Sequence, residues 1–134
     1  MIKAALCLLA LPALASAAPS VWDGVYTAEQ AARGKKFFTV NCVDCHGEDL
    51  KTEDDKTKPI AGKEFIARWD GKTLGKLLDN TKRSMPPDTP NSLSRKETAD
   101  VIAYVLSMND IPAGKTELDA AAPLVKEIVI SPKK

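Results

Sequence analysis

The sequence is poor in histidine, and this shortage limits the kinds of functional site that the chain can form more than any other feature of its composition. One histidine and three cysteines occur among 134 residues, which excludes any site built on two imidazoles. Basic and acidic residues number 19 and 18, so no excess of one sign points to nucleic acid or an acidic membrane as a partner. After the first 17 residues, no apolar run is long enough for a transmembrane helix.

Residues 1–17 have the pattern of a secretory signal peptide. Lys3 gives a positive start, an apolar stretch follows, and Ala15-Ser16-Ala17 is a small-x-small cleavage site. A retained N-terminal anchor is the alternative. Cys7 lies inside the apolar stretch rather than after the cleavage site, which argues against lipidation. We expect the mature chain, with 18 residues of each charge, to be periplasmic or secreted without stable membrane insertion.

The run Cys42-Val43-Asp44-Cys45-His46 is the strongest functional signal in the chain. Two cysteines separated by two residues and followed at once by histidine have the spacing for covalent c-type haem attachment. Each thiol adds across one haem vinyl group to form a thioether, and the adjacent imidazole binds the iron. We therefore predict one haem c, attached to Cys42 and Cys45 and ligated by His46.

Three other interpretations of this run remain as alternatives. A structural zinc site takes four protein ligands, and after Cys42, Cys45 and His46 the chain offers only carboxylates. A thioredoxin-like redox pair favours a βαβ context in a reducing compartment, and no β-rich pattern surrounds the motif. A disulfide between residues three apart would be strained.

A six-coordinate haem iron needs a second axial ligand, and methionine is the donor that accompanies a single histidine in electron-transfer cytochromes. The mature chain offers Met85 and Met108. Met108 lies near the end of an amphipathic helix, where methionine commonly fills the core. Met85 precedes Pro86 and Pro87, which stiffen the loop and lower the cost of ordering it. We predict Met85 as the distal ligand.

The remaining pattern predicts an all-helical domain of four or five helices with no internal repeat. Thr27, Thr73 and Ser94 are expected N-caps, and Gln30 and Glu97 complete two capping boxes. Prolines exclude regular structure over 84–91. The expected helices cover residues 28–41, 63–69, 74–82 and a last strong helix after Ser94 that Pro112 and Gly114 end, with a short candidate at 120–126 and a β-branched run at 128–130.

These residues resemble class I c-type cytochromes. Gly34, Phe38 and Cys42 follow one another four residues apart, and Tyr104 is similar to the aromatic that packs on that glycine from the last helix. The resemblance implies a cytochrome c fold around one haem and implies that the carbonyl of Pro59 accepts a hydrogen bond from the axial histidine. The resemblance covers about residues 27–109. We expect a cytochrome c domain at 27–110, with an extended arm at 18–26 before it and a C-terminal extension at 111–134 after it. A wider pattern is similar to small cytochrome domains found beside quinoprotein alcohol dehydrogenases.

The implied function is electron transport rather than catalysis. We expect a carrier that moves one electron at a time between redox proteins, a dehydrogenase and/or a terminal oxidase, and that acts on no substrate itself. A tightly bound electron-accepting subunit of a quinoprotein dehydrogenase is the alternative. A haem enzyme or gas sensor with an open distal site is a third, which the lack of a second histidine for acid–base chemistry disfavours.

Overall fold

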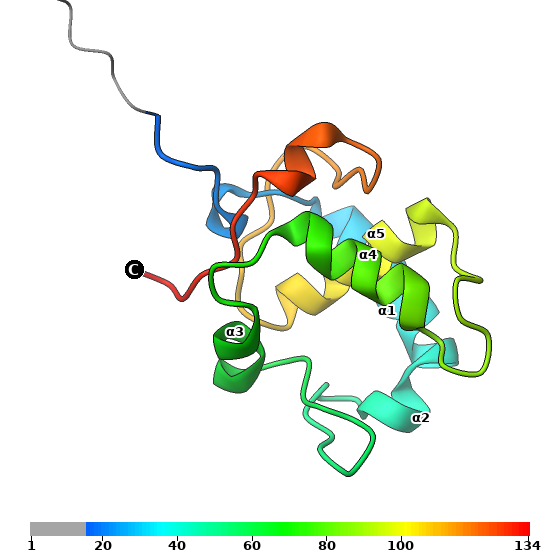
Figure 1. The fold of residues 1–134 in the computed structure, drawn as a ribbon. Coiled ribbons are helices and arrows are strands. Elements are labelled where there is room, and N and C mark those ends of the chain that lie inside the picture. Colours follow the sequence, from blue (N-terminus) through cyan, green and yellow to red (C-terminus); the bar gives the residue numbers. More distant parts are fainter. Residues whose placement is uncertain (1–15) are drawn as a thin grey trace, which may run out of the picture.

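The computed structural model describes residues 16–134, and this part of the chain is helical without a β-strand. The all-α prediction is confirmed. The predicted signal peptide falls almost wholly outside the described residues. In order, the elements are the 3₁₀ helix η1 (Val21–Asp23), α1 (Ala28–Asn41), α2 (Val43–His46), α3 (Lys63–Trp69), α4 (Leu74–Ser84), α5 (Arg95–Ser107) and the 3₁₀ helix η2 (Pro123–Lys126) (Figure 1).

Short polar side chains begin the long helices, as their sequences predict. The hydroxyl of Thr27 accepts from the Gln30 N–H at 3.2 Å at the start of α1. Thr73 begins α4 in the same way. Ser94 and Glu97 form a complete capping box at the start of α5.

The capping box predicted at Gln30 is wrong, because the Gln30 side chain bonds elsewhere. Its amide nitrogen donates to the Leu118 carbonyl at 2.8 Å, and its oxygen accepts from the Leu118 N–H at 2.7 Å. Gln30 is 1% exposed, so this pair satisfies a buried polar side chain. It also fixes the C-terminal segment to α1.

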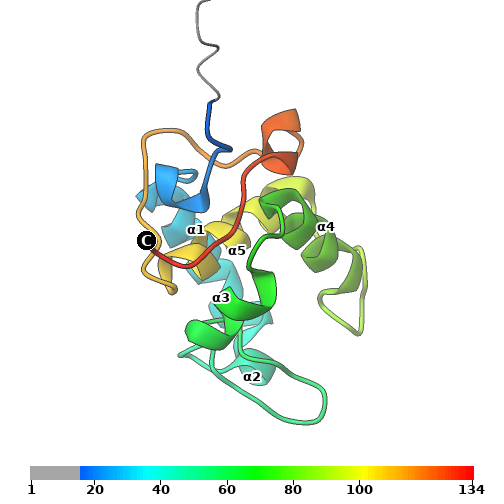
Figure 2. The ribbon, with the colours of Figure 1, turned by 60° about the vertical axis from the view of Figure 1, so that its left-hand side comes forward.

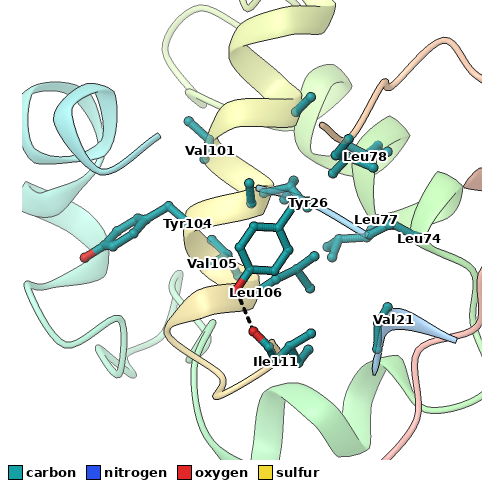
Figure 3. Close-up of a cluster of buried hydrophobic side chains, with 14 of the residues drawn as sticks. Val21, Tyr26, Leu74, Leu77, Leu78, Val101, Tyr104, Val105, Leu106 and Ile111 are labelled. Carbon is teal, nitrogen blue, oxygen red and sulfur yellow. Dashed lines mark hydrogen bonds between the residues drawn. The ribbon is translucent and has the colours of Figure 1, made fainter. Parts of the chain in front are cut away.

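Helices α1 and α5 pack directly on each other and form the centre of the fold (Figure 1). The ring of Phe38 on α1 meets the ring of Tyr104 on α5 edge to face, with centroids 5.3 Å apart. Apolar side chains from α4, from α5 and from the segments before α1 and after α5 form a buried cluster (Figure 3). Those drawn and labelled there are Val21, Tyr26, Leu74, Leu77, Leu78, Val101, Tyr104, Val105, Leu106 and Ile111.

The N-terminal arm and the C-terminal segment lie side by side (Figure 2). Val129 donates to the Pro19 carbonyl at 2.8 Å and accepts from Val21 at 3.0 Å. The Trp22 indole donates to the Ser131 carbonyl at 2.9 Å. Ile130, with no exposed surface, belongs to the core. Residues 111–134 are therefore packed onto the domain.

Several boundaries differ from those expected. The arm contains η1 rather than being extended throughout, and α4 runs on to Ser84. The expected helix at 120–126 is the 3₁₀ turn η2, and the β-branched run makes only isolated bridges, from Val129 to Ser20 and Thr73. Met108 caps α5 and is 36% exposed, so its expected role as core filler is wrong. None of the helices in the described part has the length and apolar character to cross a bilayer.

Candidate functional site

A cavity of about 670 Å³ lies between α1, α2, α3, α4 and α5. This volume is within the range of about 300–1,000 Å³ typical of small-molecule and cofactor pockets. Aromatic and aliphatic side chains from all sides form much of its wall, which suits a large apolar ligand. They are Phe38, Ile60, Phe65, Trp69, Leu77, Leu93, Val101, Ile102 and Val105.

The cysteine–histidine motif forms one helical turn at the edge of this cavity. The Cys42 carbonyl accepts from the N–H groups of Cys45 at 3.3 Å and His46 at 3.0 Å. Residues three and four apart share one face of a helix. Cys42, Cys45 and His46 accordingly all line the cavity. Gly47, at φ 73°, ends the turn in a conformation that costs glycine little.

His46 borders the cavity in a form able to bind a metal. Burial lowers the pKa of His46 below its ordinary value, so the imidazole is neutral at pH 7, and the neutral ring is the ligating form. Its Nδ1 atom is buried and has no hydrogen-bond partner. A buried polar atom without a partner is rare and commonly marks a functional group.

The two thiols are separate, and the Cys42 thiol is protonated at neutral pH in this geometry. Burial, and then the neighbouring Cys45, raise the pKa of Cys42 to about 11. Cys42 and Cys45 are not joined in a disulfide. Over residues 16–134, no group of three or more histidine, cysteine or carboxylate side chains is arranged to hold a metal ion by itself.

Met85 reaches the same cavity from a different element. It follows the last residue of α4, and its N–H donates to the Thr81 carbonyl at 2.9 Å. The peptide bond to Pro86 is cis. Met85 lines the cavity, whereas Met108 does not. The fold thus brings the predicted methionine together with Cys42, Cys45 and His46.

The structure gives Pro59 a partner other than the predicted one. Its carbonyl accepts a hydrogen bond from the guanidinium of Arg68 on α3. Lys58 and Ile60, on either side of Pro59, line the cavity, but Pro59 itself does not. A carbonyl oxygen has two lone pairs, so the bond from Arg68 leaves one for a second donor.

Sequence reasoning missed several residues of the cavity wall. Phe65, Arg68 and Trp69 on α3 all line it, although the sequence identified α3 only as a short helix. The spacing of Phe65 and Trp69, four residues apart, was a signal for one apolar face. Nothing local marks Arg68, whose partner lies nine residues earlier.

These residues fit a c-type haem. Two thiols and an unpartnered imidazole stand on one helical turn, a thioether donor enters from α4, and the wall between them is largely apolar. This donor set matches the chemistry of haem attachment and His/Met ligation. It is a poor match for structural zinc, which takes four protein ligands.

Comparison with known proteins bears on the family and on the fold. The model of the family "Cytochrome C oxidase, cbb3-type, subunit III" matches residues 29–105. No curated protein matches the chain. A chain in the crystal structure of the sulfane dehydrogenase SoxCD from Paracoccus pantotrophus is similar in fold, with a TM-score of 0.54 and 24% identity over 96% of this chain and 68% of that one. The family match covers more than half of the sequence, and the chain therefore belongs to this family of c-type cytochromes, which transfer electrons through haem.

Proposed function

We propose that the chain is a periplasmic monohaem carrier whose haem c is attached to Cys42 and Cys45 and ligated by His46 and Met85. The observation that carries this proposal is the convergence of all four side chains on one cavity of about 670 Å³. They come from two segments some forty residues apart in the sequence, and no local pattern requires that they meet. A bound haem would supply the Fe(III)/Fe(II) couple.

The protein attaches the haem, encloses it in an apolar cavity and supplies both axial ligands of the iron. Thioethers at Cys42 and Cys45 fix it covalently, and the apolar wall removes it from water, which influences the potential. With the four porphyrin nitrogens, His46 and Met85 would complete six-coordination of the iron and leave no vacant position. The chain therefore acts as a carrier and not as an enzyme. The carbonyl of Pro59 is the proposed acceptor for Nδ1 of His46, alongside the bond from Arg68.

The domain plan and localisation are also part of the proposal. Residues 1–17 act as a signal peptide, 27–110 form the cytochrome c domain, and 18–26 and 111–134 flank it. The apolar start of the chain agrees with export, which is usual for c-type cytochrome domains. Redox proteins, a dehydrogenase and/or a terminal oxidase, are the proposed partners.

A second candidate function is that of a fixed electron-accepting subunit of a dehydrogenase. The similarity to a chain from a sulfane dehydrogenase structure extends over 96% of this chain, so it includes most of residues 111–134 as well as the haem-binding part. Purification from the native source under mild conditions distinguishes the two. A free carrier elutes alone, whereas a subunit elutes with a large partner.

Absorbance spectra of the purified protein, oxidised and reduced, test the proposed function. We expect a low-spin six-coordinate haem in both states, with no spectral change when carbon monoxide is added to the reduced protein. A carrier needs no vacant position, and a coordination sphere that stays saturated changes little between redox states. Rapid carbon monoxide binding would contradict the carrier and favour a sensor or an enzyme.

A further inference from the structure

The loop that carries Met85 has few polar contacts of its own. This loop, residues 85–93, leads from the end of α4 to the N-cap of α5. Its internal backbone bonds are two turns, from the Thr89 N–H to the Pro86 carbonyl at 3.1 Å and from the Ser92 N–H to the Thr89 carbonyl at 3.2 Å. Its prolines have no N–H to donate. The loop therefore needs a contact from outside to hold it against the domain.

Lys82 supplies that contact. Its ammonium group donates to the carbonyl of Leu93 at 2.8 Å and to the side-chain oxygen of Asn91 at 2.9 Å, and it lies 3.4 Å from the carbonyl of Asn91. Between residues 16 and 134, no other side chain outside the loop forms a hydrogen bond with residues 86–93. A lysine ammonium has three N–H donors, so this geometry accounts for all of them.

The position of Lys82 makes these bonds a link between the two ends of the loop. Lys82 lies on the last turn of α4, just before Met85, and its partners lie at the far end of the loop. Leu93 is 6% exposed, and it lines the same cavity as Met85. Hydrogen bonds from a charged donor are stronger than those between neutral groups. The contact with Leu93 thus connects the surface of α4 to the cavity wall.

The neighbouring cations of α4 and its N-terminal turn face another region. Lys72, Lys76 and Arg83 border a second hollow beside Trp69. Lys72 also lies over the Trp69 ring, 5.3 Å from its centroid. Lys82 does not line that hollow. Its role is therefore separable from that of a general positive surface on this helix.

We propose that Lys82 is a positioning residue that holds the Met85 loop closed against the cavity. The inference rests on the proposed ligation by Met85. By tying Asn91 and Leu93 to α4, Lys82 lowers the fraction of molecules in which the loop is open and the sulfur is withdrawn. An external ligand competes with Met85 only in that open fraction, so its apparent affinity rises in proportion to the fraction.

Imidazole binding to the oxidised holoprotein tests the proposal in a matched set of variants. Lys82→Gln removes the ammonium and its bonds to the loop, and Lys76→Gln removes the same charge from the same helix. We expect Lys82→Gln to raise the apparent imidazole affinity about fivefold, as the loss of a partly exposed charged contact implies. We expect Lys76→Gln to change it by less than about twofold, because the Lys76 side chain forms no hydrogen bond with the loop in the described part of the chain and an exposed charge contributes little by itself.

Two further variants test the direction of the change in imidazole affinity. Lys82→Arg keeps charged donors and should restore most of the wild-type affinity. Asn91→Asp turns the contact with Lys82 into an ion pair and should weaken imidazole binding. Asn91 has φ 64°, a conformation that aspartate also tolerates. Hydrogen exchange should become faster in residues 86–93 of Lys82→Gln and stay unchanged in α1 and α5.

The outcomes separate failure of this inference from failure of the proposed function. If wild-type protein lacks the weak near-infrared band of Fe(III)–sulfur bonding, Met85 is not the ligand and the proposed coordination is wrong. If that band is present and Lys82→Gln and Lys76→Gln behave alike, the proposed role of Lys82 is overturned. Faster hydrogen exchange throughout Lys82→Gln would also overturn it, because that result indicates a general loss of stability.

Discussion

Gly34 and Asp100 meet backbone against backbone where α1 crosses α5. A Cβ atom at Gly34 would overlap the Asp100 carbonyl oxygen and lie 3.0 Å from Cβ of Tyr104. Neither neighbour is the end of a flexible side chain, so the helices themselves would have to separate. The close approach also places the ring of Tyr104 against Phe38, beside the cavity.

Gly34→Ala should therefore destabilise the protein, by about 1–3 kcal/mol as overpacking of a tight contact typically does. Helix propensity predicts the opposite sign, a gain of about 1 kcal/mol for replacing glycine by alanine within a helix. Chemical denaturation measures the free energy of unfolding. Ala32→Gly, on the exposed side of α1, is the control for propensity alone. A more stable Gly34→Ala variant would show that the crossing is looser than described.

Acid should weaken the protein partly through Asp100. Burial acts to raise the pKa of Asp100, but hydrogen bonds from Arg33 and Lys96 outweigh it and hold the pKa below its ordinary value. Arg33 binds Asp100 at 3.1 Å and Lys96 binds it at 2.8 Å. A carboxylate whose pKa is lower in the folded state stabilises above its unfolded pKa, near 3.9. That contribution disappears as the pH falls through the folded value.

Asp100→Asn tests this contribution. The unfolding midpoint of the variant should lie below that of the wild type at pH 6–7, and the two should converge as the pH is lowered below about 4. Asp79→Asn removes an exposed carboxylate from α4 and serves as the control. If the difference in unfolding midpoint between Asp100→Asn and the wild type stayed constant with pH, the variant would have lost packing and not charge interactions.

The Tyr26 hydroxyl ties the start of the domain to its C-terminal extension. It donates to the Ile111 carbonyl at 2.5 Å within the core (Figure 3), and the Tyr26 carbonyl accepts from Gly114 at 2.6 Å. Tyr26→Phe leaves a buried carbonyl without its donor, so it should cost about 1–3 kcal/mol of unfolding free energy. Hydrogen exchange in residues 111–118 should accelerate.

Tyr104→Phe is the matched control, because no hydrogen bond of the Tyr104 hydroxyl occurs among the residues that the structure describes. That variant should be close to wild type in thermal unfolding. If both phenylalanine variants lost the same unfolding free energy, the hydrogen bond between Tyr26 and Ile111 would contribute no stability of its own.

Met85 and Met108 should respond differently to substitution. Met85→Ala should abolish the near-infrared Fe(III)–sulfur band, lower the reduction potential and allow carbon monoxide to bind, since a thioether ligand raises the potential. Met108→Leu, at the half-exposed end of α5, should change none of the three. Reversed roles in spectra and redox titration would contradict the proposed coordination.

Much of this architecture follows from local rules in the sequence. Thr27, Thr73 and Ser94 mark the starts of three helices, and each hydroxyl accepts the expected N–H. The cysteine–histidine spacing needs only one helical turn to face a single cavity. Features of this kind depend on residues within four positions of each other, so periodicity and capping predict them.

The remaining features depend on partners distant in sequence. Gln30 has the spacing of a capping-box residue, but the buried backbone of Leu118 competes successfully for its amide. Residues Ile128–Ile130 have strand-like composition, yet only isolated bridges form, because the extended partners Ser20 and Thr73 are each followed at once by a helix, η1 and α4. The contacts of Lys82 depend on the path of the loop after α4. Prolines exclude regular secondary structure there, so periodicity does not predict that path.

Intact-mass spectrometry of the denatured protein, after acid–organic extraction, tests the central claim most directly. Thioethers at Cys42 and Cys45 survive unfolding, so the account predicts the mass of the polypeptide plus one haem. A Cys42→Ser/Cys45→Ser double variant should give the polypeptide mass alone. If the extracted wild-type protein also had the mass of the bare polypeptide, covalent attachment at these cysteines would be contradicted.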